Sequence, residues 1–270
     1  MSTAVAPAGL SAAELDRHAA EYAQDGLTVI TDVIPGALLA AMREQAERLR
    51  AHTHALRGPD AHRPPSGIVG GRLLLDFDGV VDAAPFAELP HLPRLRSVVD
   101  RILGAGFTLD TDAYTMLFST TTRSECQPWH RDYRDNLPGT DVDRWRALVP
   151  DLRFFNQFNA ALYDDVSLWV VPGSHAREDT PEEARILAAG APSRDGMEEC
   201  DYVVAASRYR RSMPGGRCVM LSAGDVAVYR DCALHLGHYI PTALRATLHG
   251  HFEDEVTRAY FREAFPAAFA

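Results

Sequence analysis

The sequence predicts a mainly β domain with flanking α-helices, and three observations support this prediction. Short strand-like segments separated by turn residues follow one another from Phe107 to about residue 252. Helical patterns with an apolar stripe precede them. The length of 270 residues is enough for one large hydrophobic core, and all-β barrels often occupy that length as a single domain. We therefore expect one domain over residues 11–270, with its strands in a sandwich or barrel.

The N-terminal part of this domain is predicted to be largely helical. The Ser11 to Glu14 pattern matches a capping box, which begins a helix, and Gly26 is suited to end it. The Ala, Pro and Gly content of residues 1–10 favours disorder. The elements expected in this part are a helix over 11–24, a strand over 27–34, a helix over 35–56, a loop over 57–71 and a helix over 92–103.

Strands are expected at 113–119, 127–132, 153–162, 167–171, 217–221, 225–230 and 243–252. An insertion over residues 176–216 interrupts them, and only its segment 181–189 has a helical pattern. The insertion carries Arg208, Arg210 and Arg211 in an otherwise acidic chain. Two interpretations stay open, namely a lid that contacts polar or anionic groups of the substrate and a solvated charged loop.

Composition excludes several classes of function. The formal net charge of −10 argues against a nucleic-acid partner, because such binding depends on neutralising phosphates. All 27 Lys and Arg residues are arginine, so lysine Schiff-base and P-loop chemistry are excluded. No apolar run is long enough to span a bilayer. The four cysteines form no C-x-x-C pair and are expected to be free thiols. We expect a soluble cytoplasmic protein with a small-molecule substrate.

An H-x-D pair, His130 and Asp132, lies on one of the predicted strands. Side chains at i and i+2 share a face of a strand, so these two residues could chelate one ion. A facial triad of two histidines and one carboxylate also needs a distant third ligand, and it leaves coordination positions open for small molecules. His235 follows a predicted turn and strand, and Arg245 follows it ten positions later.

The order of these motifs resembles the phytanoyl-CoA dioxygenase-like family of Fe(II)- and 2-oxoglutarate-dependent oxygenases. After H-x-D come Leu168–His175, which contains the distinctive Pro-Gly-Ser-His, and then Gly224–Val226, His235 and Arg245. The opening helix that runs into Asp25–Ile30 is also similar, so the resemblance extends over nearly the whole chain. It implies a double-stranded β-helix, a cupin-like jelly-roll barrel, with N-terminal helices.

The same resemblance implies residue roles. His130, Asp132 and His235 would bind Fe(II). Arg245 would pair with the distal carboxylate of 2-oxoglutarate, and a planar guanidinium suits that task because it can form two parallel hydrogen bonds. Asn159 is the candidate for a further contact with this cosubstrate. The implied reaction uses O₂ to oxidise a C–H bond of a small molecule in specialised metabolism such as antibiotic biosynthesis, with hydroxylation as the default and cyclisation, desaturation or epimerisation as alternatives.

One position departs from the family pattern. Some relatives have a hydroxyl-bearing side chain two residues after the second histidine ligand, where this sequence has Gly237. We therefore expect the cosubstrate pocket to be completed in a different way.

Alternatives to this assignment exist. A zinc-dependent hydrolase could use the same His-Asp-His site, but Arg245 would then have no role. A catalytically silent metal-binding barrel is a second alternative. His238 could replace His235 as a ligand, and we prefer His235 because of its interval to Arg245. His249 is expected to be a hydrogen-bonded interior residue, and the Asp164-Asp165 pair a turn.

Overall fold

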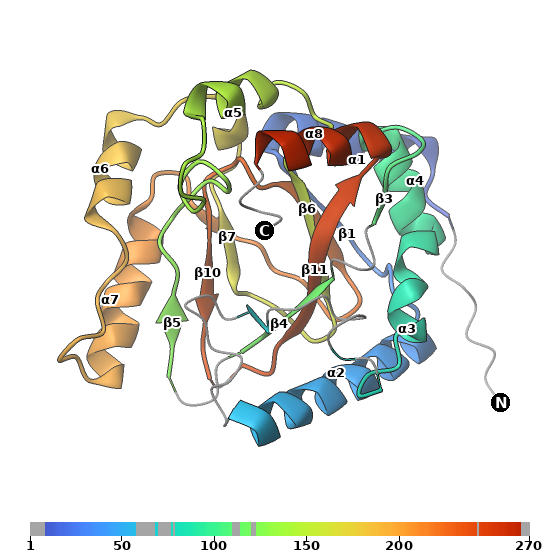
Figure 1. Ribbon diagram of the computed structural model, residues 1–270, viewed down its shortest axis with the longest axis horizontal. Helices are drawn as coiled ribbons and strands as arrows, with labels where there is room; N and C mark the ends of the chain where they lie inside the picture. The colour runs from blue at the N-terminus through green and yellow to red at the C-terminus, as the bar shows by residue number, and fades with distance from the viewer. Residues whose placement is uncertain are drawn as a thin grey trace.

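Two antiparallel sheets face each other, and helices cover their outer sides (Figure 1). This computed structural model describes residues 9–57, 68–69, 77, 79–109, 114–119, 123–241 and 243–265. The prediction of a mainly β fold with flanking helices is confirmed. The strand pairs described do not join the two sheets into a closed barrel. The predicted disorder of 1–10 and the predicted loop over 57–71 fall almost wholly outside the described residues.

The larger sheet has the strand order β1-β9-β6-β11-β4-β2, with β3 also paired to β11. Its central pair, β6 and β11, is antiparallel with Thr247 opposite Ala161 and His249 opposite Asn159. The strands are β1 (Leu27–Ile30), β2 (Ile68–Val69), β3 (Thr108–Leu109), β4 (Thr115–Phe118), β6 (Asn156–Ala161), β9 (Val226–Arg230) and β11 (Ala246–Glu253).

The smaller sheet has the order β5-β10-β7-β8. In it β10 pairs with β7 so that His235 lies opposite Val170. Its strands are β5 (Glu125–Cys126), β7 (Leu168–Val170), β8 (Arg217–Cys218) and β10 (His235–Tyr239).

Helices α1, α2 and α4 bury the outer face of the larger sheet. Helix α1 begins at the expected capping box and ends at Gly26, which adopts φ 72°. Tyr22, Met42 and Val98 from these helices are fully buried in one core with Phe158 of the sheet. The helices of this side are α1 (Ala12–Asp25), α2 (Gly36–Arg57), α3 (Ala84–Ala87), the 3-10 helix η1 (Leu89–His91) and α4 (Pro93–Ile102).

Strand alternation determines which side chains face the gap between the sheets. On β11, Leu248 and Phe252 pack into the helix-covered core. Successive side chains of a strand point to opposite faces, so Thr247 and His249 face the gap instead. The same rule on β10 directs His235 toward the gap and Leu236 toward the outer helices. Side chains from both sheets therefore point into the same gap, and this brings the candidate functional residues on these strands together.

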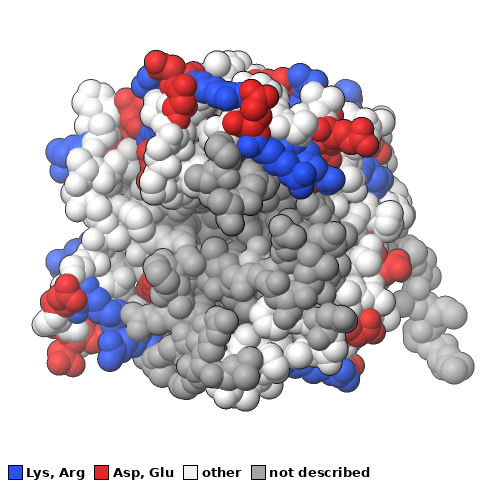
Figure 2. All heavy atoms as spheres, viewed as in Figure 1, with Lys and Arg blue, Asp and Glu red and all other residues white. Residues whose placement is uncertain are grey.

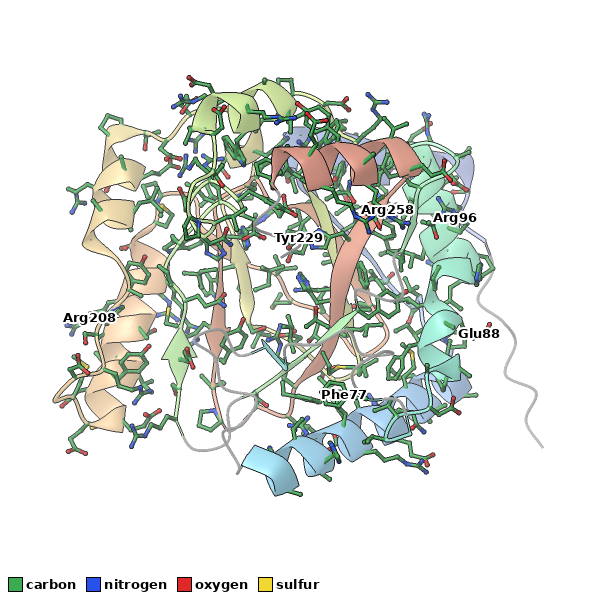
Figure 3. All side chains as sticks on the ribbon, viewed as in Figure 1. Phe77, Glu88, Arg96, Arg208, Tyr229 and Arg258 are labelled. Carbon is green, nitrogen blue, oxygen red and sulfur yellow. The ribbon has the colours of Figure 1, made fainter. Side chains whose placement is uncertain are left out.

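Helices cover the outer face of the smaller sheet, and they form most of the insertion 176–216. The helical prediction for 181–189 is confirmed as α6 (Pro181–Ala189), but α7 (Glu199–Ser212) was missed. Tyr202 of α7 is buried, and its hydroxyl accepts a hydrogen bond of 3.0 Å from the Cys126 amide. Arg208 points away from both sheets (Figure 3). The insertion is thus a helical cover, and its role as a lid stays a prediction.

Several local predictions were wrong. The strand predicted over 127–132 does not form. Strand β5 ends at Cys126, because Pro128 lacks the amide that a ladder needs, although His130 still forms an isolated bridge with His235. Strand β10 was missed, since its His, Gly and Tyr content lacks a β-branched residue. Helices α5 (Val142–Leu148) and α8 (Glu255–Ala264) were also missed, and they enclose an aromatic cluster. Among the described residues, no helix has the length and apolar character to cross a membrane.

Candidate metal centre and cosubstrate cavity

His130, Asp132 and His235 converge between the two sheets. One potential ligand atom from each lies within 4.8 Å of the others. The backbones of His130 and His235 exchange two hydrogen bonds, each 3.0 Å long, and the two imidazole centroids are 4.3 Å apart. This bridge brings the H-x-D segment beside β10, so residues more than 100 positions apart form one cluster.

Both imidazoles present the same nitrogen to the cluster. His130 Nδ1 lies 2.8 Å from the Pro128 carbonyl, and His235 Nδ1 lies 2.9 Å from the Ala233 carbonyl. When each Nδ1 donates its proton to that carbonyl, each Nε2 keeps a lone pair directed at the cluster. Burial lowers the pKa of His235 to about 4, so this side chain is neutral near pH 7, which is the form that binds metals.

The Asp132 carboxylate is held by two amides. Gln157 Nε2 donates to one oxygen over 2.6 Å, and Asn136 Nδ2 donates to the other. The Tyr229 hydroxyl in turn donates to Gln157 Oε1 over 2.8 Å, and Tyr229 lies between the sheets (Figure 3). Burial alone would raise the pKa of Asp132, but the adjacent imidazoles and the Gln157 amide lower it, so the group is a carboxylate.

The rejected alternative His238 lies on the opposite face of β10. Its Nδ1 accepts a hydrogen bond of 2.7 Å from Arg210 Nη1 of α7. Two residues of a strand that differ by an odd number of positions point to opposite sides. His238 therefore cannot join the cluster that contains His235 without a reversal of the strand.

Arg245 is buried, with 4% of its surface exposed, and it is paired with Asp165. Its Nε donates to Asp165 Oδ2 over 2.8 Å, and the Thr247 hydroxyl donates to the same oxygen over 2.6 Å. The other oxygen accepts from Ser167. Arg245 Nη1 is buried and has no hydrogen-bond partner among the described residues. Asp165 thus holds the guanidinium by one edge and leaves donor capacity for a ligand.

Sequence reasoning missed the role of Asp165, since an Asp-Asp pair before a strand is typical of a turn. The backbone does form a bridge there, between Asp165 and Leu221. The available signal was chemical: a chain with a buried arginine needs a buried acid to compensate for its charge. Nothing in the local sequence indicates which acid that is.

All five predicted site residues line one cavity of about 490 Å³ between the sheets. This volume is in the range of small-molecule sites. Asn159 contacts His249 in its wall, with Asn159 Oδ1 2.9 Å from His249 Nδ1. Burial lowers the pKa of His249 to about 3, so it is the neutral interior histidine that was expected. In the described part of the chain, no residue of 176–216 lines this cavity.

The Pro-Gly-Ser-His turn joins the segments that carry the triad. Arg131, between His130 and Asp132, is fully buried and donates from Nη1 to the Ser174 and Cys232 carbonyls, each over 2.7 Å. The Leu234 amide, next to His235, donates to Ser174 Oγ over 2.8 Å. Ser174 therefore bonds to the neighbours of all three candidate ligands, which gives this turn a structural role.

The family model for phytanoyl-CoA dioxygenase (PhyH) matches residues 22–242, which is most of the chain. The chain belongs to the phytanoyl-CoA dioxygenase family. Enzymes of this family are Fe(II)- and 2-oxoglutarate-dependent oxygenases, so the chain is an oxygenase-type enzyme with iron and 2-oxoglutarate as cofactors. No curated protein matches the sequence.

Several solved structures have a similar fold. SnoN, titled a non-heme alpha ketoglutarate dependent epimerase from nogalamycin biosynthesis, has a TM-score of 0.56 and 21% identity, over 90% of this chain and 82% of that chain. AviO1 from Streptomyces viridochromogenes Tue57 has a TM-score of 0.55 and 20% identity, over 92% and 97%. SnoK, titled a carbocyclase from nogalamycin biosynthesis, has a TM-score of 0.51 and 17% identity, over 91% and 84%. At these identities the likeness shows the fold.

The residues of the cavity fit the cofactors of the phytanoyl-CoA dioxygenase family. Two imidazoles and one carboxylate are the donor set of non-haem Fe(II) oxygenases. The buried guanidinium with an unpartnered Nη1 suits a carboxylate. A zinc hydrolase would leave this guanidinium unexplained, and no finding favours that alternative.

Proposed function

We propose that this protein is a dioxygenase that binds Fe(II) through His130, Asp132 and His235 and oxidises a C–H bond of a small molecule. The observation that supports it most is that the three donors and the buried Arg245 line the same cavity. Bound Fe(II) and 2-oxoglutarate would supply the means to activate O₂ and remove hydrogen from the substrate.

The protein side chains would bind and orient these groups. Arg245, held at its Nε by Asp165, would direct its remaining N–H groups to the distal carboxylate of 2-oxoglutarate. Asn159 lines the same cavity and is a second candidate contact. Gln157 and Asn136 would keep the Asp132 carboxylate oriented toward the metal.

We further propose hydroxylation as the default reaction and a compound of specialised metabolism as substrate. The nogalamycin enzymes with a similar fold are titled an epimerase and a carbocyclase, so ring closure and epimerisation stay alternatives for this chain. Arginine and acidic side chains lie next to one another along the upper edge of the face in Figure 2.

A direct test adds Fe(II) and 2-oxoglutarate to the protein without oxygen and records the weak visible absorption of the chelate. We expect this band for the wild type and a much weaker response for Arg245→Lys at the same cosubstrate concentration. An ammonium cannot reproduce the two parallel hydrogen bonds of a guanidinium, so the dissociation constant for 2-oxoglutarate should rise about ten-fold or more. An unchanged dissociation constant would remove Arg245 from the site, and absence of the band in the wild type would contradict the proposed function.

Gln157→Leu should weaken metal binding, because Asp132 loses the amide that orients it. Removal of such an outer partner typically costs about 10- to 100-fold in metal affinity. Titration with Ni(II), followed by calorimetry, would measure the change. Asn159→Ala is the matched control, since Asn159 lines the cavity but contacts His249. Equal Ni(II) affinity in Gln157→Leu and the wild type would show that the amide is dispensable.

A further inference from the structure

The side chain of Tyr239 occupies the space that a side chain at position 237 would need. His235, Gly237 and Tyr239 share the face of β10 that looks into the gap between the sheets. A Cβ atom added to Gly237 would lie 2.3 Å from the Tyr239 hydroxyl oxygen and 2.8 Å from Gln127 Oε1. Such distances are far below van der Waals contact, so a side chain at position 237 would displace the Tyr239 phenol, which folds back along the strand toward Gly237, and the Gln127 amide.

The same tyrosine is packed against the candidate cosubstrate arginine. The guanidinium carbon of Arg245 lies 4.9 Å from the centroid of the Tyr239 ring. Both residues line the cavity that contains the triad, and Tyr239 is 4% exposed. The ring therefore lies against the guanidinium, and the hydroxyl, which lies beside Gly237, is also close enough to Arg245 for a side-chain hydrogen bond. Tyr239 ends β10 of the smaller sheet and Arg245 directly precedes β11 of the larger sheet, so this contact also links the sheets at the cavity wall.

The protonation state of Tyr239 suits a donor. Burial raises the pKa of Tyr239, while Arg245 opposes the shift only in part. The phenol thus keeps its proton near pH 7. A carboxylate that reaches Arg245 Nη1, which has no hydrogen-bond partner in the described structure, would lie beside this O–H group.

We propose that the Tyr239 hydroxyl, seated over Gly237, donates a hydrogen bond to the distal carboxylate of 2-oxoglutarate and so acts with Arg245 as a cosubstrate-binding residue. The inference rests on the proposed function, since it needs 2-oxoglutarate at Arg245. It assigns to a tyrosine four positions after His235 the contact that a short hydroxyl side chain at position 237 could make. Arg245 would supply charged donors and Tyr239 a neutral one.

The first test compares 2-oxoglutarate binding to Ni(II)-loaded wild type and Tyr239→Phe by calorimetry. Phenylalanine keeps the ring under Arg245 and removes only the hydroxyl. A hydrogen bond to a charged group is lost, so we expect the dissociation constant for 2-oxoglutarate to rise about ten-fold. The analogue 2-oxobutanoate lacks the distal carboxylate and should bind both proteins equally. Tyr163→Phe is the matched control, because Arg43 also lies over the Tyr163 ring, 4.6 Å from its centroid, outside this cavity.

The second test moves the hydroxyl group from position 239 to position 237. Gly237→Ser alone should weaken 2-oxoglutarate binding, because its side chain collides with Tyr239. Tyr239→Leu alone should also weaken it, through loss of the hydroxyl. The double variant Gly237→Ser/Tyr239→Leu should bind 2-oxoglutarate more tightly than Tyr239→Leu, since the serine hydroxyl enters the vacated space. Recovery would show that a hydroxyl in this space contributes to the binding of 2-oxoglutarate.

The outcomes separate this inference from the proposed function. If Arg245→Met weakens 2-oxoglutarate binding but Tyr239→Phe does not, the tyrosine inference is overturned and the cosubstrate site stands. The inference is also overturned if Tyr239→Phe weakens 2-oxobutanoate equally. If Arg245→Met binds 2-oxoglutarate like the wild type, the cosubstrate site itself is wrong.

Discussion

Alanine in place of His130, Asp132 or His235 should abolish turnover and high-affinity iron binding. Each variant leaves two of three protein donors, and a facial triad cannot hold its metal with two. The loss should exceed the roughly 10- to 100-fold that removal of an outer hydrogen-bond partner costs. Iron content after anaerobic loading and succinate release from 2-oxoglutarate would both measure it.

His238→Ala is the matched control for this series. His238 belongs to the same strand as His235, is equally buried and contacts Arg210 on the outer face. We expect its iron content to equal that of the wild type. An inactive His238→Ala together with an active His235→Ala would show that the ligand assignment on β10 is wrong.

The substitution Asp165→Asn should cost much of the stability of the fold as well as cosubstrate affinity. It leaves the Arg245 guanidinium charged, 4% exposed and without its acid. Breaking one side of a buried ion pair costs about 3 to 5 kcal/mol in the free energy of unfolding. Urea denaturation of the metal-free protein would measure the loss.

The neighbouring Asp164→Asn provides the comparison. Asp164 is exposed and accepts a hydrogen bond from the Ala223 amide. We expect a change of less than about 1 kcal/mol for it, as for most exposed substitutions. Equal stability of the two variants would mean that the Asp165 to Arg245 pair contributes nothing.

The pair also predicts a pH dependence. Burial acts to raise the pKa of Asp165, but Arg245 and the hydrogen bonds from Ser167 and Thr247 lower it below its ordinary value. A group with a lowered folded pKa stabilises the fold above its unfolded pKa, near 4, and loses that contribution as the pH falls through the folded pKa. Wild-type unfolding should therefore become easier below about pH 4, and Asp165→Asn should lack this part of the acid sensitivity.

The main residues of the site could be predicted because they follow patterns that are visible in the amino-acid sequence alone. The i and i+2 spacing of His130 and Asp132, with His235 and Arg245 later in a fixed order, identified residues that the structure brings into one cavity. Strand parity also anticipated that Asn159 and His249 would face the interior. These inferences need only the alternation of a pleated strand and the order of the motifs.

The parts that could not be predicted depend on contacts between distant segments. Helix α7 carries charged residues on several faces, so its buried stripe around Tyr202 is hard to distinguish from a charged loop. Asp165 looks like a turn residue until Arg245 is placed beside it. The space beside Gly237 is filled by the side chain of Tyr239, and no local sequence pattern indicates this contact.

The bonds at Ser174 have a mechanical consequence for the metal centre. Its carbonyl holds Arg131 and its hydroxyl holds the Leu234 amide, so one turn is attached to both of the neighbouring backbone segments that bear the donors. When the two sheets shift relative to each other in thermal motion, the segments that bear His130 and His235 must move together with this turn. The distances between the donors of these two segments should therefore change little when the sheets move.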